Sequence, residues 1–158
     1  MFNLDVIKWN YKRNKLEGNA LLEHSMFDEE VLEWDTALKD YLEGSLFIED
    51  VVVDLVDALC DAIFVDSGSK AKGFFMNNTD RLSYMMSVTT EILIENNINP
   101  SIIEKCLMLV VEANNLKPLT KTSGKVTKGT KWIDPKILIK SELFPISEVE
   151  DEQVSSEL

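Results

Sequence analysis

The chain has 158 residues, of which 45% are hydrophobic and 28% are charged, and its formal net charge is −12. This length suits one compact domain with tails, and the composition is that of a globular protein rather than a disordered or fibrous one. The negative charge excludes a general nucleic-acid binder, because such a protein needs a basic surface to neutralise phosphates.

The sequence predicts neither a membrane span nor a secretion signal. No apolar run reaches the about 18–20 residues needed to cross a bilayer, and the longest candidate, residues 51–65, is interrupted by three aspartates. The first ten residues lack a basic region followed by an apolar stretch, so we expect no signal peptide. Cys60 and Cys106 lie in apolar helical patterns, where a cysteine is usually a small buried hydrophobe. We therefore expect a cytoplasmic protein with no membrane partner.

Hydrophobic periodicity predicts three helices in the first half of the chain. The first covers about residues 4–16. The second begins near Ser25, a residue type that suits an N-cap, and ends at Gly44. The third covers about residues 46–65 and ends before Ser67 and Gly68, which open a loop rich in Ser, Gly and Lys.

Two more helices are predicted in the second half. Thr79 is expected to cap a fourth helix that ends near Asn96. Asn99 and Pro100 suit the N-cap and first position of a fifth, which ends near Asn115. After Lys117, two prolines and two glycines interrupt the pattern, so a loop with room for a short strand or turn is expected.

The predicted architecture is all-α. Residues 1–140 are expected to form a single domain, a four- to five-helix bundle with an irregular basic C-terminal segment. Residues 141–158 are polar and acidic and are expected to form a disordered tail. Charge is unevenly distributed, because residues 22–66 carry fourteen Asp or Glu and one Lys, whereas residues 117–140 carry seven Lys and one Asp.

The second predicted helix directs carboxylates toward its apolar side. At 100° per residue, Glu30 falls inside the arc formed by Trp34 and other apolar residues, Glu33 falls at the edge of this arc, and Glu29 points away. A bland alternative is that Glu33 lies at the boundary of the core and Glu30 bends out to solvent, since unpaired buried acids are rare.

The third predicted helix is apolar except for one acidic stripe. Its four aspartates within 60° of arc are Asp50, Asp54, Asp57 and Asp61. They could form a solvated stripe, but like charges four residues apart cost roughly 0.2–0.5 kcal/mol per pair, and Asp is a poor residue inside a helix. A bound cation explains the stripe better.

Ligand type restricts the cation. Hard carboxylate oxygens suit Mg²⁺, Mn²⁺ or Ca²⁺, whereas zinc or di-iron sites favour imidazole. His24 is the only histidine, and we expect it at the surface. Mg²⁺ held by carboxylates usually completes its shell with substrate phosphates, and the lysines of residues 117–131 could reach those phosphates. Alone, such a lysine run is more often a solvated loop.

Two acidic motifs resemble those of a known family. Residues 29–33 read EExxE, and Asp54 to Asp57 reads as a DxxD version of ExxD. This order is similar to that of the MazG-like all-α nucleotide pyrophosphohydrolases, including small, often phage-encoded members and phosphoribosyl-ATP pyrophosphohydrolase-like relatives. The similarity extends over about residues 5–140 through three further stretches: WNYKRN (9–14), VDALCDAIFV (56–65) and EANNLK…GKVTKG…KWIDPKI (112–137).

The resemblance implies hydrolysis between the α- and β-phosphates of an NTP or dNTP, giving the monophosphate and pyrophosphate. It implies Mg²⁺, with Mn²⁺ as a substitute, and a free carboxylate, Glu29 or Glu30, as proton acceptor. The implied metal ligands are Glu30, Glu33, Asp57 and either Asp54 or Asp61. The implied substrate contacts are Arg13, Asn14, Asn114, Lys117, Lys128 and Lys131. For a phage-encoded member, the compartment would be the host cytoplasm.

The chain departs from the family pattern in two places. Asp54 stands where the family has Glu, which shortens the reach by one methylene, and the motif can be matched through Asp54 and Asp57 or through Asp57 and Asp61. Residues 69–99 form a longer stretch than the smallest members need, suited to a lid or an oligomer contact. Many apolar helix faces on a small domain suggest a homodimer or homotetramer.

Two other classes of function remain open. A catalytically inactive relative would bind nucleotide with Mg²⁺ without forming product. An acidic protein-interaction module would keep its aspartate stripe exposed to solvent and would be indifferent to Mg²⁺. We expect Trp9 and Trp34 to belong to the core rather than to stack on a base.

Overall fold

The computed structural model describes residues 3–12, 19–74, 77–117, 121–122, 125–126 and 132–146. These contain six helices: α1 (Asn3–Lys12), α2 (Ala20–Glu43), α3 (Ile48–Ala71), α4 (Thr79–Glu95), α5 (Ile102–Asn115) and α6 (Pro135–Leu143). Two strands of two residues, β1 (Lys121–Thr122) and β2 (Lys125–Val126), pair antiparallel. The predicted all-α class is confirmed.

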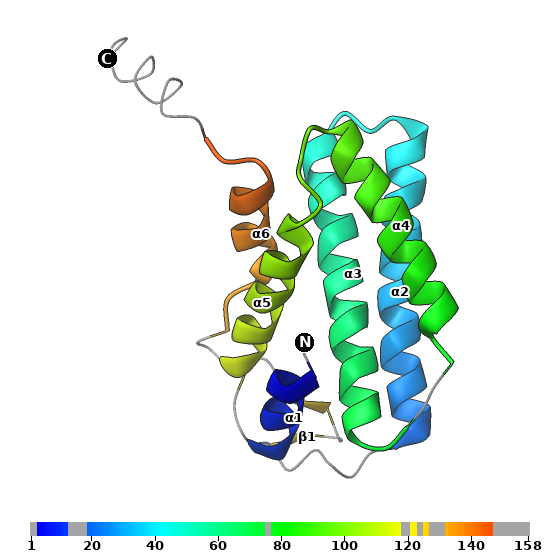
Figure 1. Ribbon diagram of the computed structural model, residues 1–158, viewed down its shortest axis with the longest axis vertical. Coiled ribbons are helices and arrows are strands. Elements are labelled where there is room, and N and C mark those ends of the chain that lie inside the picture. Colours follow the sequence, from blue (N-terminus) through cyan, green and yellow to red (C-terminus); the bar gives the residue numbers. More distant parts are fainter. Residues whose placement is uncertain are drawn as a thin grey trace.

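Helix α3 is the centre of the fold. It packs against α1, α2, α4, α5 and α6, which surround it in Figure 1. A helix that is apolar around most of its circumference is buried on all sides, and Val52, Leu55, Val56 and Leu59 are each completely buried. Of the acidic stripe of this helix, Asp57 is buried in the protein, whereas Asp50, near the start of the helix, is exposed.

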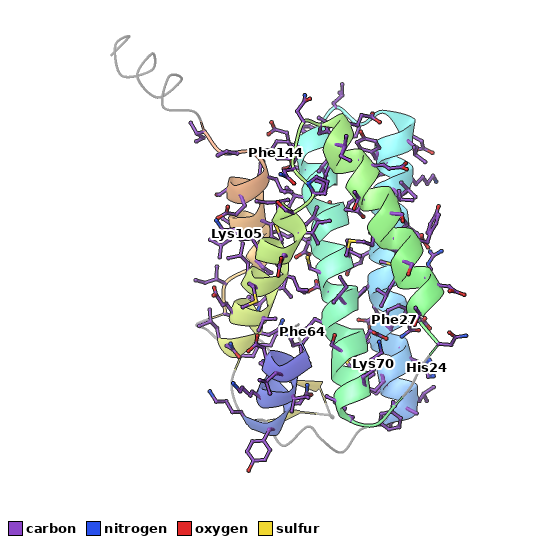
Figure 2. The ribbon with its side chains drawn as sticks, viewed as in Figure 1. His24, Phe27, Phe64, Lys70, Lys105 and Phe144 are labelled. Carbon is purple, nitrogen blue, oxygen red and sulfur yellow. The ribbon has the colours of Figure 1, made fainter. Side chains whose placement is uncertain are left out.

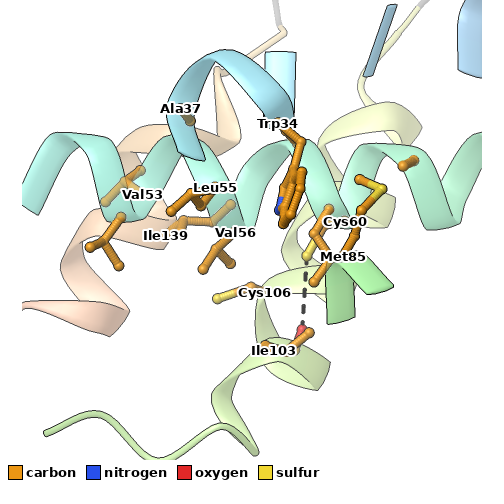
Figure 3. Close-up of a cluster of buried hydrophobic side chains, with 14 of the residues drawn as sticks. Trp34, Ala37, Val53, Leu55, Val56, Cys60, Met85, Ile103, Cys106 and Ile139 are labelled. Carbon is orange, nitrogen blue, oxygen red and sulfur yellow. Dashed lines mark hydrogen bonds between the residues drawn. The ribbon is translucent and has the colours of Figure 1, made fainter. Parts of the chain in front are cut away.

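The core joins α3 to α2, α4 and α5 (Figure 3). Trp34 is fully buried, and its Nε1 donates a hydrogen bond to Thr89 Oγ1 at 3.0 Å. Cys60 and Cys106 are buried, as the sequence predicts; both are free cysteines, and Cys60 Sγ lies 4.0 Å from the Ile103 carbonyl oxygen. These polar atoms of the core thus find their hydrogen-bond partners within the core itself.

The start of α2 and the end of α3 differ from the sequence prediction. Helix α2 begins five residues before Ser25, because the Asn19 side chain accepts a hydrogen bond from Leu22 N and caps it. Its end at Gly44 is confirmed by a left-handed φ of 82°. Helix α3 continues through Gly68 to Ala71, because Gly68 packs closely against α1, and such tertiary contacts override weak local propensity.

Helices α1, α4 and α5 agree with the prediction within a few residues. The N-cap position of helix α4 is Asn78 rather than Thr79, but the Asn78 side chain makes no capping hydrogen bond and its Nδ2 donates to Asp66 Oδ1 at 3.0 Å. Helix α1 ends at Lys12, and the rest of the predicted first helix lies outside the described residues.

Helix α6 was not predicted, because Pro135 was interpreted as a breaker. Proline is well suited to the first position of a helix, and the Asp134 side chain caps α6 by accepting from Lys136 N. Ile139 and Leu143 are buried against the core, so helix α6 runs three residues into the predicted tail. Residues 147–158 of that tail lie outside the described residues.

Within the described ranges, no helix combines the length and apolar character that a membrane crossing requires. The exposed position expected for His24 is confirmed, and Figure 2 labels it on α2 near the buried Phe27.

Candidate functional site

A cavity of about 340 Å³ opens between α1, α2, α3, the end of α5 and the start of α6. Such a volume is in the range of small-molecule sites. Its walls combine acidic, basic, amide and aromatic side chains, among them Trp9, Asn10, Glu23, Glu29, Glu30, Glu33, Asp57, Asp61, Phe64, Lys72, Asn114, Lys117, Trp132 and Lys136.

One face of α3 and one face of α2 form most of the cavity wall. The α3 residues that line it are Asp57, Asp61, Phe64, Val65 and Gly68, and Lys72 directly after the helix lines it as well; apart from Val65, they follow one another at intervals of three or four. Intervals of three and four place side chains on one side of a helix. The lining residues of α2 include Glu23, Met26, Glu30 and Glu33, which follow the same rule.

Two of the acidic side chains hold oxygens with no partner. Among the described residues, Glu30 Oε2 and Asp57 Oδ1 are the buried side-chain oxygens or nitrogens that make no hydrogen bond. Asp57 is only 4% exposed. A buried, unsatisfied polar group costs about 1–3 kcal/mol, and more when charged. These two oxygens therefore need an explanation in terms of something the cavity binds.

Both carboxyl groups ionise less readily than usual. Burial, followed by the charges of Glu33 and Asp57, raises the pKa of Glu30 from 4.5 to about 7. Burial also raises the pKa of Asp57 from 3.8 to about 7, although Lys136 acts in the opposite direction. Perturbed carboxyl groups in a cleft are candidates for a functional site.

Asp61 completes an acidic group. Burial, followed by the charges of Asp57 and Glu30, raises the pKa of Asp61 well above its usual value, and Lys117 opposes the shift. Glu33 contributes to the raised pKa of each of the other three carboxyl groups. Glu30, Glu33, Asp57 and Asp61 therefore act on one another through space, and we refer to them as the carboxylate cluster.

The other half of the aspartate stripe has a different role. Asp54 does not line the cavity and lies 3.3 Å from Lys136 Nζ, and Asp50 lies 2.7 Å from Lys140 Nζ. Both lysines come from α6, which the sequence analysis missed. Asp50 and Asp54 therefore have lysine partners that balance their charge without a bound cation, and the metal-ligand role expected for Asp54 remains a prediction. Of the two motif registers left open, the structure brings Asp57 and Asp61 to the cavity.

The remaining predicted residues are distributed as follows. Glu29 is exposed, as its helical position predicts, yet it lines the cavity beside Glu30. Asn114 is buried in the wall. Its side-chain Nδ2 donates to the backbone carbonyl oxygen of Val110, and its backbone carbonyl oxygen accepts from Trp9 Nε1. Lys117 also lines the cavity.

Four predicted substrate contacts, Arg13, Asn14, Lys128 and Lys131, lie outside the described residues. Among the cavity residues that the sequence analysis did not single out for it are Glu23, Phe64, Lys72 and Lys136. The sequence could have indicated Glu23 and Phe64, because each lies about two helical turns from a predicted ligand, Glu23 from Glu30 and Phe64 from Asp57. Lys72 and Lys136 could not be assigned to the cavity from the sequence, because α3 extends beyond its predicted end and α6 is not predicted.

The chemistry of the cluster fits a hard divalent cation. The donors are carboxylates from two helices, and two of their buried oxygens have no other partner, which is the oxygen-rich environment that Mg²⁺ prefers. In the described part of the chain, no group of three or more His, Cys, Asp or Glu side chains lies in an arrangement that could hold a metal ion as it stands.

Comparison of the chain with protein-family models, with curated proteins and with solved structures finds no match. The function is therefore inferred from the chemistry of the cavity.

Proposed function

We propose that this protein is a Mg²⁺-dependent nucleoside triphosphate pyrophosphohydrolase, built on a helical bundle of the MazG-like type, that cleaves between the α- and β-phosphates. The observation that carries the proposal is the pair of buried oxygens without partners, Glu30 Oε2 and Asp57 Oδ1, within a cluster of four carboxylates at the wall of a ligand-sized cavity. A cation supplied together with a polyphosphate would satisfy both.

Each carboxylate of the cluster has a proposed role. Glu33, Asp57 and Asp61 hold the cation, together with Glu30. When bound, Mg²⁺ supplies positive charge to the phosphate oxygens and makes a water molecule more acidic. Glu29, beside the cluster, takes the proton from the attacking water, since a general base must lie close to the proton that it removes.

The lysines at the cavity support the choice of a phosphate substrate. Lys117 and Lys136 line the same cavity as the carboxylate cluster and moderate the pKa of Asp61 and Asp57, respectively. A cavity that needed only a metal ion would gain nothing from cations at its wall, because like charges repel. A polyphosphate bridging metal and lysines accounts for both signs of charge.

The burial of Asp57 weighs against an acidic interaction module, which needs its aspartates exposed. An inactive nucleotide-binding module would use the same cavity and differs only in product formation. The expected homodimer or homotetramer remains a prediction.

The test is pyrophosphate release from a panel of NTPs and dNTPs, with and without Mg²⁺. We expect metal-dependent release that Glu33→Ala and Asp57→Asn abolish. The matched control is Asp50→Asn, on the same helix and paired with Lys140 outside the cavity, which should retain turnover. Mg²⁺-dependent nucleotide binding without release would identify an inactive module, and full activity in Asp57→Asn would sink the site assignment.

A further inference from the structure

A second charged feature lies at the other end of the cavity. Glu23 on α2 and Lys72 at the end of α3 form an ion pair whose side chains are 2% and 4% exposed, and both line the cavity. The Glu23 Oε2 atom also accepts a hydrogen bond from Ser69 Oγ at 2.7 Å. A buried ion pair is weak evidence for stability, because removing two charges from water costs about as much as their attraction returns.

This pair has hydrogen-bonding capacity to spare. An ammonium carries three N–H donors, and among the described residues Glu23 Oε1 is the hydrogen-bond acceptor of Lys72 Nζ. A carboxylate offers about four lone-pair positions, and Glu23 uses one for Lys72 and one for Ser69. When only the described residues are counted, two N–H donors of Lys72 and two acceptor positions of Glu23 thus remain, on side chains that line the cavity.

The distance between the two ends suits a nucleoside. Glu23 precedes Glu30 by seven residues, which is about 10 Å along α2 at the helical rise of about 1.5 Å per residue. Between the ends, Trp9 and Phe64 meet edge to face with ring centroids 5.3 Å apart, and both line the cavity; Figure 2 labels Phe64 near α1. A nucleotide with its phosphates at the carboxylate cluster would pass these rings and present its base to Glu23 and Lys72.

We propose that Glu23 and Lys72 recognise the base of the nucleotide, and that this base is guanine. The inference rests on the proposed function for the orientation of the substrate. Guanine places a carbonyl acceptor beside two adjacent N–H donors on one edge, so Lys72 can donate to O6 while both free positions of Glu23 accept. Adenine, cytosine and uracil each offer that carboxylate only one such donor, which leaves a buried acceptor position unused.

The first experiment measures binding of GMP, AMP, CMP and UMP to the full chain, so that its outcome does not depend on hydrolysis. We expect GMP to bind about tenfold to a hundredfold more tightly than the others, the range for one well-matched bidentate contact. Equal binding of the four monophosphates, or a preference for another base, would overturn the proposal. Preferential GMP binding without any NTP cleavage would overturn the proposed reaction and leave base recognition standing.

The second experiment changes the pair. Removing one partner leaves a buried charge and can unfold the protein, so the informative variant is the double replacement Glu23→Gln with Lys72→Met, which keeps both side-chain sizes. We expect it to keep the stabilisation by Mg²⁺ and to lose the preference for GMP. Lys70→Met is the matched control, because Lys70 pairs with Asp66 outside the cavity, and it should keep that preference. An unchanged preference in the double variant would assign the pair a structural role only.

Discussion

Glu30 Oε2 on α2 and Asp57 Oδ1 on α3 are buried on neighbouring helices, and neither has a hydrogen-bond partner among the described residues. Proteins rarely leave such groups unsatisfied. The two residues belong to one cluster with Glu33 and Asp61, in which burial and the neighbouring charges raise the pKa values of Glu30, Asp57 and Asp61. The cluster therefore lowers the stability of the ligand-free protein, which is typical of a site whose ligand stabilises it when bound.

Asp57→Asn should stabilise the metal-free protein. The change removes a buried negative charge from a cluster of like charges and leaves a neutral polar group in its place, so we expect unfolding at pH 8 to require roughly 1–3 kcal/mol more, because an unpaired buried charge costs more than an unpaired neutral group. Urea denaturation without Mg²⁺ measures this. Asp50→Asn, at an exposed pair, should change stability by less than about 0.5 kcal/mol. Clear destabilisation by Asp57→Asn would mean that the carboxylate is satisfied in the free protein.

Stability without metal should fall as the pH rises from about 4 to about 7. The folded pKa values of Glu30 and Asp57 are about 7, above their unfolded values of 4.5 and 3.8. In this window the folded protein binds more protons than the unfolded chain, so raising the pH favours unfolding. Mg²⁺ binds the ionised carboxylates. At ten times its Kd it should therefore raise the Tm by about 3–5 °C at pH 8, and by much less at pH 5. A shift that is equal at both pH values would contradict this.

Asp61 and Asp54 should differ in catalysis. Asp61 belongs to the carboxylate cluster, whereas Asp54 is half exposed and paired with Lys136. We expect Asp61→Asn to lower kcat/KM by about a hundredfold or more, given that even the residues supporting a metal ligand are worth 10–100-fold. Asp54→Asn should change it only severalfold. The reverse order, in steady-state pyrophosphate release, would select the register through Asp54.

The substitution Gly68→Ala should weaken nucleotide binding without lowering the stability of the protein. Alanine in place of glycine inside a helix stabilises by up to about 1 kcal/mol, and a Cβ at this position would make ordinary contacts with Asn10 Nδ2 at 3.6 Å and Val6 Cγ1 at 3.8 Å. The added methyl narrows the cavity between its two ends. We expect an equal or higher Tm together with weaker nucleotide binding. Unchanged affinity, measured by calorimetry, would show that the ligand does not pass Gly68.

Ile139→Ala should loosen α6 and with it the start of the cavity wall. Ile139 is completely buried, and truncating such a side chain costs about 2–5 kcal/mol. Because Lys136 on the same helix lines the cavity, we also expect lower turnover at temperatures where the protein stays folded. Ile137→Ala is the control on the same helix, since Ile137 is 66% exposed and its loss should cost less than about 0.5 kcal/mol. Equal effects of the two changes would contradict the packing of α6.

Local patterns in the sequence predicted the helical class and much of the acidic site. The apolar periodicity of α2 indicated that Glu30 faces inward while Glu29 does not, and the nearly continuous apolar surface of α3 indicated a buried helix carrying Asp57. Such inferences succeed because the orientation of a side chain on a helix depends on spacing alone. Helix ends were less predictable. Asn19 and Ser25 are both suitable N-cap residues, and Gly68 is of a type that often ends a helix although here it lies within one, so local preference alone does not fix these ends.

The tertiary structure decided which carboxylates belong together. Asp54 and Asp61 are equivalent in the pattern of α3, and only the position of Lys136, 82 residues beyond Asp54, pairs one and leaves the other at the cavity. The Glu23–Lys72 pair joins residues 49 apart, across two helices whose ends were misplaced by sequence reasoning. Spacing within a helix determines which side a residue faces, but the partner it meets there depends on how the helices pack. That packing minimises the free energy of the whole chain rather than of any one segment.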